Sequence, residues 1–351
     1  MPREAPVREA REFDPRQVSA SRVQALTQCG VAFKYRYIDG LPGEISGSAA
    51  LFGKVIHDAL EWWAPDRSQE LPPLVEAAWE HNGKDNAVGA FLREYRPLST
   101  QAIKVQHEIQ QRRPEIKAPR MTGDWKKSAV AKDINRLLAI WIPKLEADSP
   151  WRFSQYDPLP QLYDDSRQLA LRYQERARAW PNSLHTEFEF NVEWRGFRLT
   201  GFIDSIEPII DATGELRGVG IVDYKTYAKA PVELKDYRQL VMYDVAVRDL
   251  VARGQLQLPL DIEKNGLLVG VDFVRWTDKW DCPPRRFWRI TEADHDRLER
   301  ELNTYGQMVD HGDFLPAEKG RNPDFCDYPS MCCLRTCNGP GGGAELVEIK
   351  L

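Results

Sequence analysis

The sequence predicts an α/β protein in which helices and strands are unevenly distributed. Residues 66–180 repeat apolar side chains with the helical period of about 3.6 residues, whereas residues 185–224 alternate polar and apolar side chains as half-buried strands do. Strand-like and helix-like segments then follow one another from residue 233 to residue 309. With 351 residues, of which 42% are hydrophobic and 29% charged, the chain can bury the core of one elaborated domain or two small ones.

The N-terminal region is expected to contain an arm and two helices. Residues 1–18 are charged and contain proline, so we expect a loose arm. The stretch 19–37 is amphipathic, with Ser21 as a plausible N-cap, and the stretch 49–63 is a second helix that stops at Pro65.

The middle of the chain, residues 66–180, is expected to be helical and carries no recognisable motif. Helices are predicted over residues 74–79, 87–95, 129–145 and 166–180. Proline-rich joints are expected between them at residues 72–73, 114–119 and 158–160.

The second half of the chain is where strands are expected. The predicted strands are residues 185–194, 197–206, 217–224, 266–276 and 285–290, with a hairpin turn at 211–215 between the second and the third. The predicted helices are residues 233–253 and 291–309, the second capped by Thr291. From residue 313 onward the tail is rich in Pro, Cys and Gly.

Charge and composition narrow the classes of protein. A net charge of −5 argues against a protein that coats DNA passively, although a local stripe of Lys and Arg can still follow a phosphate backbone. The apolar runs are too short to cross a bilayer and the N-terminus has no apolar signal segment, so we expect a cytoplasmic protein without membrane contact. In a reducing compartment the six cysteines favour metal ligands or free thiols over disulfides.

Two polar clusters in the predicted strands suit a cation site. Asp223 and Lys225 are two residues apart and point to the same face of their strand, and a hairpin joins this strand to that of Asp204. Neighbouring strands lie about 4.8 Å apart, so both carboxylates can reach one Mg²⁺ ion, while the lysine polarises a water molecule. A surface salt bridge is the alternative. The apolar run 219–222 argues against it, because charges at the end of a buried strand are costly without a function.

Two helical pairs accompany these carboxylates. His57 and Glu61 are one turn apart on one helix face, with Gly53 on the same side. A neutral imidazole at His57 favours a softer ion such as Mn²⁺. Gln239 and Tyr243 likewise share a face of the helix that follows the strands. Taken alone, each pair would be explained better by ordinary helix packing than by a functional site.

Taken in order, these residues resemble the motifs of the RecB branch of the PD-(D/E)XK nuclease superfamily, which includes recombination-machine nuclease domains and CRISPR adaptation nucleases. The resemblance covers residues 19–63 and 184–337 and leaves the helical middle unexplained as an insertion. The matching residues, in chain order, are Ser19, Ser21 and Cys29, then Gly53, His57 and Glu61, then Gly201 and Asp204, then Asp223, Tyr224 and Lys225, and finally Gln239 and Tyr243.

The resemblance implies a restriction-endonuclease-like fold, with a mixed central β-sheet flanked by helices. It implies Mg²⁺ or Mn²⁺ ligands at His57, Asp204, Asp223 and the carbonyl of Tyr224. Lys225 would assist the nucleophile, and Glu61, Gln239 and Tyr243 would position DNA. The expected organisation is an arm (1–18), N-terminal core helices (19–65), a helical insertion (66–180), the core sheet and helices (181–312) and a cysteine-rich tail (313–351).

The resemblance also implies a [4Fe–4S] cluster, because many members of this branch hold one with one early and three late cysteines. The expected ligands are Cys29, Cys326, Cys332 and Cys337, with Cys333 as a substitute. The sequence departs from the pattern at Pro323, where a cysteine is expected, and at Gly30, where a proline is expected. Structural zinc and free thiols are the alternatives.

The function expected from the resemblance is a divalent-metal-dependent DNA nuclease, an exonuclease acting on DNA ends or single strands in repair, recombination or phage replication. A catalytically silent cluster-bearing or zinc-bearing DNA-binding subunit of a larger complex is the alternative, and a scaffold built around a zinc-bound tail is another. The acidic residues and the lysine that a silent relative would lose are all present. No P-loop motif occurs, so a helicase or recombination partner would have to supply any motor.

Overall fold

A computed structural model describes residues 13–41, 43, 46–112, 128–149, 151–153, 158–211, 213–227, 237–262, 266–316 and 328. The chain divides into two compact units. The first comprises Met1–Ile45 and Pro181–Leu351, and the second comprises Ser46–Trp180. The helix that carries His57 therefore belongs to the second unit.

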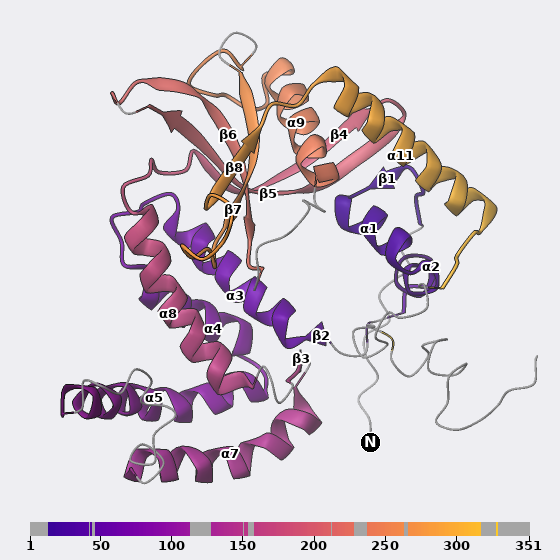
Figure 1. Ribbon diagram of the computed structural model, residues 1–351. Coiled ribbons are helices and arrows are strands. Elements are labelled where there is room, and N and C mark those ends of the chain that lie inside the picture. The colour runs from indigo at the N-terminus through magenta and orange to yellow at the C-terminus, as the bar shows by residue number, and fades with distance from the viewer. Residues whose placement is uncertain are drawn as a thin grey trace, which may run out of the picture. The chain divides into compact units, whose positions relative to one another are not determined.

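The first unit is built on a six-stranded mixed sheet (Figure 1). Its strands are β1 (Gln17–Val18), β4 (His185–Trp194), β5 (Phe197–Ile210), β6 (Leu216–Lys225), β7 (Leu267–Phe273) and β8 (Arg285–Trp288). The pairs β1–β5 and β6–β7 are parallel, whereas β4–β5, β5–β6 and β7–β8 are antiparallel. The predicted α/β fold with a mixed sheet flanked by helices is confirmed.

Strand β5 is the central strand and has two partners on one edge. Along its other edge it pairs with β4 over residues 197–206. On the first edge, β1 pairs with Arg198 and Leu199, and β6 pairs from Ser205 to Ile210. Within the described part of the chain, residues 200–204 of β5 therefore have no ladder partner on that edge. The sheet opens at this point, and Asp204 lies at the end of the opening.

Three longer helices of the first unit pack together on the sheet (Figure 1). They are α1 (Ala20–Gln28), α9 (Tyr237–Ala252) and α11 (Glu292–His311). Helix α9 contacts β4, β5, β6 and β7, and both α1 and α11 contact α9. Buried apolar side chains from the strands and these helices form one continuous core.

The N-terminal segment differs from the expectation in three ways. Residues 17–18 form a strand rather than part of a loose arm. The N-cap of α1 is Ser19, whose Oγ accepts a hydrogen bond from the backbone N–H of Arg22 at 3.2 Å, so the assignment of Ser21 was wrong. The helix also breaks at Cys29, whose backbone is extended, before α2 (Gly30–Phe33) and the π-helix η1 (Lys34–Ile38) continue the chain. The capping residue Thr291 of α11, by contrast, is confirmed and forms a capping box.

The second unit is a helical assembly with one short parallel strand pair. Its elements are β2 (Ser46–Gly47), α3 (Ser48–Trp63), α4 (Leu71–Gly83), α5 (Ala87–Arg112), α7 (Ala129–Asp148), β3 (Trp151–Arg152) and α8 (Leu159–Ala177). Helices α4 and α8 begin earlier than predicted, because the prolines expected to precede them stand in their first turns. A first-turn proline lacks only an N–H that has no partner within the helix. Helix α5 extends to Arg112 with Pro97 inside it, and the joint expected at residues 114–119 lies outside the described residues. None of the described helices is long and apolar enough to cross a membrane.

Candidate active site

Four residues at the end of β6 and on α9 form a closed ring of contacts. The ammonium of Lys225 lies 2.7 Å from Asp223 Oδ2 and donates to Gln239 Oε1 at 3.2 Å. The Gln239 amide donates to the Tyr243 hydroxyl at 2.5 Å, and this hydroxyl donates to Asp223 Oδ1 at 3.4 Å. Asp223 is 1% exposed, so its charge is held in a nearly water-free position by these groups. Alternation along β6 and one-turn spacing on α9 bring the four side chains together.

Asp204 lies where β6 separates from β5. Ser205 and Val222 form the last cross-strand pair, so Asp204 and Asp223 are the next residues of their strands. Beyond this pair the backbone N–H of Tyr224 donates to Asp204 Oδ2 at 2.6 Å. The carboxylate of Asp204 thus accepts the hydrogen bond that a backbone carbonyl of a neighbouring strand would accept in a regular sheet. The predicted neighbouring strands are therefore present, and both carboxylates stand at the opening in the sheet edge.

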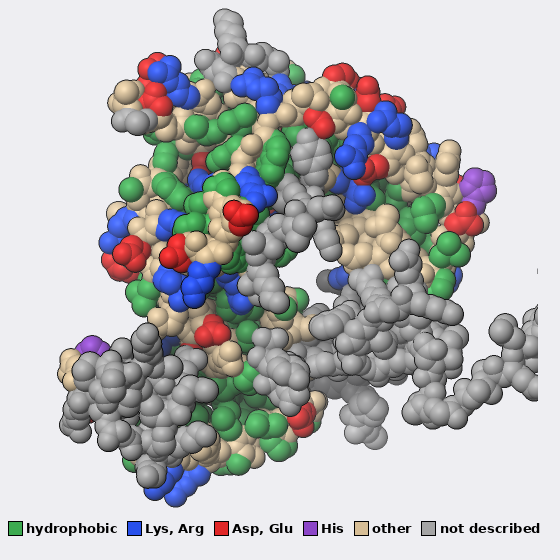
Figure 2. Space-filling view, in the orientation of Figure 1, with side chains coloured by type: hydrophobic (Ala, Val, Ile, Leu, Met, Phe, Trp, Pro, Cys, Tyr) green, Lys and Arg blue, Asp and Glu red, His purple; other side chains and the backbone are tan. Residues whose placement is uncertain are grey.

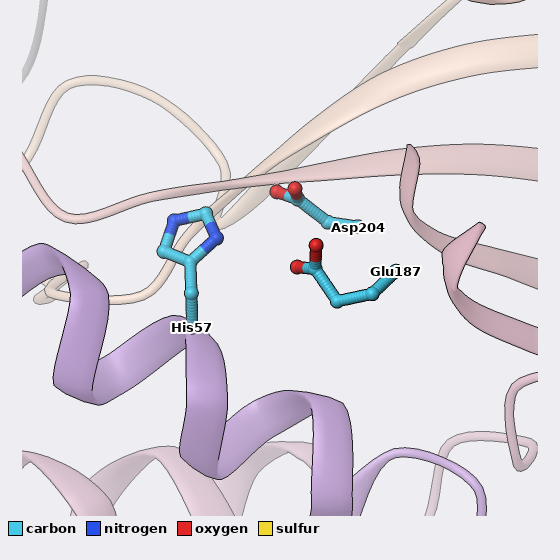
Figure 3. A group of neighbouring side chains, drawn as sticks. All are labelled: His57, Glu187 and Asp204. Atoms are coloured by element: carbon cyan, nitrogen blue, oxygen red, sulfur yellow. The ribbon is translucent and has the colours of Figure 1, made fainter. Parts of the chain in front are cut away.

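Glu187 on β4 adds a third carboxylate, which the sequence analysis did not identify. One of its oxygens lies within 4.8 Å of an oxygen of Asp204, and Figure 3 shows the two carboxylates projecting in the same direction from adjacent strands. The backbone of Glu187 has φ 43°, which is rare for a residue with a side chain. The ladder between β4 and β5 pairs Thr186 with Ser205 and Phe188 with Ile203, but it omits Glu187 and Asp204.

The pKa of Tyr243 is raised by its buried and negatively charged surroundings. Burial raises this pKa well above 10.0, and the negative charges of Asp223, Asp204 and Glu187 raise it further. The hydrogen bond from Gln239 acts in the opposite direction. The phenol is therefore protonated and acts as a hydrogen-bond donor in this site.

A buried ionic network supports β6 from its other face. The Tyr224 hydroxyl donates to Glu207 Oε1 at 3.4 Å. Arg285 on β8 donates to Glu207 at 2.7 Å and to Asp272 on β7 at 2.9 Å. Glu207 and Asp272 are almost fully buried, so the guanidinium offsets their charges. The network ties β5, β6, β7 and β8 together behind Tyr224.

The remaining motif residues lie on α3 of the second unit. His57 is half-buried, and Figure 3 draws its imidazole on this helix. Glu61 follows one turn later, and burial, then the charge of Asp58, raises its pKa. Lys54 and His81 act in the opposite direction.

A cavity of about 620 Å³ adjoins the ring of contacts within the first unit. It is lined by the start of α1, by β4, by the open part of β5 and by α9, and its lining includes Ser19, Ser21, Asn191, Phe202, Gln239 and Tyr243. Most of the lining is polar and uncharged, but the side chain of Phe202 is 53% exposed. The predicted motif residues Ser19, Ser21, Gln239 and Tyr243 therefore share one cavity.

Gly201 explains why the motif beside this cavity begins with a glycine. A Cβ atom at Gly201 would lie 2.8 Å from the ring of Phe190. That ring packs edge-on against Tyr243, with centroids 5.9 Å apart. The absent side chain lets Phe190 support the tyrosine of the site.

The cysteines can be described only in part. Cys29 is a half-buried free thiol at the break between α1 and α2. Cys326, Cys332, Cys333 and Cys337 lie outside the described residues. The chain after α11 nevertheless returns to the Cys29 segment, because the N–H of Gly30 donates to the carbonyl of Leu315 at 2.7 Å. The hydroxyl of Tyr328 likewise donates to the carbonyl of Leu41 at 2.9 Å.

The surface of the described residues shows no single basic field on the face in view. Lys and Arg side chains are interspersed with Asp and Glu there (Figure 2). Affinity for a polyanion would therefore depend on local groups rather than on the charge of this whole face.

Comparison with family models identifies the family of this chain. The family model of the PD-(D/E)XK nuclease superfamily matches residues 17–131 and 126–333. A search of the curated proteins finds no match. The matched residues include both carboxylates at the opening of the sheet, the lysine of β6 and the glutamine and tyrosine of α9.

Proposed function

Because this chain belongs to the PD-(D/E)XK nuclease superfamily, and is therefore of a class of metal-dependent nucleases, we propose that it is a DNA exonuclease that acts on DNA ends or single strands. The ring that joins Asp223, Lys225, Gln239 and Tyr243, placed beside Asp204 at the opening of the sheet, is the observation that supports this proposal.

The donor set fits a hard divalent cation. Asp204 and Asp223 supply carboxylate oxygens, which Mg²⁺ and Mn²⁺ prefer, and the carbonyl of Tyr224 and the imidazole of His57 are the further ligands that the family resemblance assigns. When bound, the cation supplies positive charge to the phosphate and lowers the pKa of a coordinated water. Both carboxylates are buried, so they are charges that such an ion would neutralise.

Lys225 and the two residues of α9 have separate roles in the proposed mechanism. The Lys225 ammonium is held by Asp223 and Gln239, so it can donate a hydrogen bond to the attacking water or to a phosphate oxygen without first reorganising. Tyr243 is a hydroxyl donor and not a base, since its pKa is raised. Gln239 orients both groups.

The cavity beside the ring favours a single strand as substrate. Its volume of about 620 Å³ is within the range of roughly 300 to 1,000 Å³ typical of small-ligand sites, which suits an unpaired nucleotide better than a duplex. The exposed ring of Phe202 on its lining offers a face for base stacking. Gln239 and Tyr243 belong both to this cavity and to the ring, so a nucleotide bound here would contact two residues of the ring that holds Lys225.

The nuclease proposal is tested with DNA labelled at either end, single-stranded or double-stranded, in Mg²⁺ or Mn²⁺. We expect cleavage by the wild type and a loss of at least about 100-fold in Asp223→Ala and Lys225→Ala, as is typical when charged transition-state groups are removed. Asp278→Ala and Lys279→Ala, which change exposed residues of the same unit, are the matched controls. Equal cleavage by the active-site variants and the wild type would refute the proposal.

Two further questions need their own substrates: whether the enzyme cuts from DNA ends or internally, and whether it prefers single strands. An exonuclease should leave circular single-stranded DNA intact while it degrades the same sequence in linear form. Phe202→Ala should weaken the binding of linear single strands by about 5-fold to 150-fold, the equivalent of about 1 to 3 kcal/mol for one stacked base. Phe287→Ala, another exposed phenylalanine of the sheet, is the control. Cleavage of the circle would instead indicate an endonuclease.

We further propose the RecB-type [4Fe–4S] cluster, with Cys29, Cys326, Cys332 and Cys337 as ligands and Cys333 as a substitute. Cys29 is a half-buried thiol, and the contacts of Leu315 and Tyr328 bring the tail to the segment that carries it. They also account for Gly30, because a proline there has no N–H to donate to Leu315.

The cluster proposal is tested by the metal content of the purified protein. A brown protein with visible absorption and about four iron atoms per chain, both lost in Cys29→Ser, is the expected result. A colourless protein that contains zinc would replace the cluster with the structural zinc alternative. Cys282→Ser, at the other described free thiol, is the matched control.

A further inference from the structure

We infer that the second unit contains a nucleotide-binding site of its own, which takes an unpaired base together with its phosphate in a cavity lined by α4, α5 and α8. The inference goes beyond the proposed nuclease function, because every residue that carries it lies in the second unit. The cavity has a volume of about 630 Å³, within the range of roughly 300 to 1,000 Å³ typical of small-ligand sites.

Part of the lining is an apolar wall. Trp79 of α4 and Leu92 of α5 belong to it, and both are almost fully buried. The indole N–H of Trp79 donates to the Ser166 hydroxyl at 2.8 Å, so the indole presents only apolar atoms to the cavity. The flat ring of a base can pack on such a wall, as bases do on aromatic side chains in other single-strand sites.

Tyr163 of α8 adds a buried hydroxyl to this lining. The residue is 2% exposed, and its hydroxyl has no hydrogen-bond partner among the described residues. Burial, then the negative charge of Glu76, raises the pKa of Tyr163 to about 12, so the hydroxyl keeps its proton and is a donor. A buried donor without an acceptor is costly, and a ring nitrogen or carbonyl of a base would supply that acceptor.

The proline inside α5 leaves an acceptor at the same cavity. Pro97 has no N–H, so the carbonyl of Arg93, four residues earlier, lacks its usual helical donor. Both residues line the cavity. The exocyclic amino group of a base such as adenine is a donor of the kind that this carbonyl lacks.

Two cations of the lining remain for an anionic group. Both glutamates of the lining, Glu76 and Glu80, are paired with Arg96, at 2.5 Å in the case of Glu80. Lys84 and Arg93 are exposed and take part in no ion pair within the part of the chain that the structure describes. Two such cations at the border of an apolar wall suit a phosphate group.

A nucleotide combines the features that these groups select. Its base is aromatic and carries ring acceptors and, in adenine, an amino donor, while its phosphate is anionic. A member of a nuclease superfamily meets nucleotides both as units of a strand and as free products. The two sources share this chemistry, and the experiment separates them.

The test measures the binding of dAMP to the full chain by calorimetry, in EDTA so that no strand is cleaved. Tyr163→Phe keeps the ring and removes the hydroxyl, so it should raise the Kd for dAMP about 2-fold to 12-fold, as expected for one net hydrogen bond, without lowering Tm. The double variant Lys84→Ala/Arg93→Ala should raise the Kd at least about tenfold and flatten its salt dependence. The controls are Tyr173→Phe, at a buried tyrosine of α8 outside the lining, and Lys132→Ala, at an exposed lysine of α7, and both should leave the Kd unchanged.

Two further arms identify what the cavity recognises. One replaces dAMP with an oligodeoxyadenylate strand, and the other adds inorganic phosphate as a competitor. If the variants weaken both dAMP and the strand, the cavity takes a nucleotide of a bound strand, and if they weaken dAMP alone, it takes the free nucleotide. Competition by phosphate as strong as competition by dAMP would reveal an anion site without base recognition and overturn the inference.

Failure of this inference is distinguishable from failure of the proposed function. If dAMP does not bind, or if its Kd changes in Phe202→Ala and not in the second-unit variants, the inference is wrong and the nuclease proposal stands. A Tyr163→Phe protein with a much lower Tm and an unchanged Kd would show that the hydroxyl has a structural partner, which also overturns the inference. The nuclease proposal is decided by the cleavage assay of the Asp223 and Lys225 variants, which change no residue of the second unit.

Discussion

Replacing Asp204 with asparagine should stabilise the metal-free protein and remove its response to metal. Asp204 stands beside Glu187 at the opening of the sheet, and its Oδ2 accepts the N–H of Tyr224 at 2.6 Å. Asparagine has almost the same shape, and its amide oxygen can accept the same hydrogen bond. The substitution therefore removes a charge while it preserves the local geometry.

The size of this stabilisation follows from two opposing contributions to the free energy of unfolding. At an effective dielectric constant of about 20, two unit charges 4.8 Å apart repel by about 3.5 kcal/mol, and solvent beside the half-buried Glu187 reduces this figure. A neutral acceptor for the Tyr224 N–H costs about 1 kcal/mol relative to a charged one. The net gain is about 1 to 2 kcal/mol, or a rise in Tm of roughly 2 to 8 °C for a unit of about 200 residues.

Thermal unfolding with and without Mn²⁺ checks this reasoning. Saturating metal should stabilise the wild type by about 2.7 kcal/mol at 100 times Kd and leave Asp204→Asn almost unchanged, so the order of the two Tm values should reverse on adding metal. Asp278→Asn, at an exposed site, is the control. A metal-free Asp204→Asn protein that melts well below the wild type would refute the assumption that repulsion dominates at this carboxylate.

Three further substitutions test other parts of the first unit. Gly201→Ala should lower the free energy of unfolding by about 1 to 3 kcal/mol and reduce cleavage, because its Cβ would lie 2.8 Å from the ring of Phe190; denaturant titration and the DNA assay measure both effects. The hydrogen bond to Asp244 raises the pKa of His295 above 6.5, so this contact stabilises fully below pH 6.5 and is lost as pH rises through the raised value; His295→Gln should flatten the pH profile of Tm in that window. Gly30→Ala should lower Tm, since its Cβ would lie 2.7 Å from the backbone of the segment after α11. An unchanged Tm would show that this segment can move away from the added methyl group without loss of stability.

Much of the sheet could be predicted because each strand carries its own local pattern. Residues 185–194 alternate in polarity and form β4 over the predicted range. The apolar run before Asp223 indicated a buried strand, and all of residues 218–224 in β6 are buried. The glutamine and tyrosine of α9 were predicted from one-turn spacing, and the structure places them against the end of β6.

The features that were missed depend on contacts between distant residues or on a single backbone angle. Glu187 lies in the pattern Glu-Phe-Glu-Phe, where a glutamate is typical of the solvent-facing side, and its position beside Asp204 depends on the register of β4 on β5, which the sequence does not reveal. Strand β1 is two residues long and has no period of its own, so only its pairing with Arg198 and Leu199 defines it. Ser19 and Ser21 are equally good caps in composition, and the structure alone distinguishes them.

The pairing of β1 with β5 has a consequence for the order in which the chain is completed during synthesis. Gln17 and Arg198 are 181 residues apart, and a ribosome that adds about 5 to 20 residues per second needs about 10 to 35 s to cover that distance. The whole of residues 46–180 emerges during this interval. Until residue 199 has emerged, β1 has no strand to join, so the border of the opening beside Asp204 is assembled only after more than half of the polypeptide has been translated.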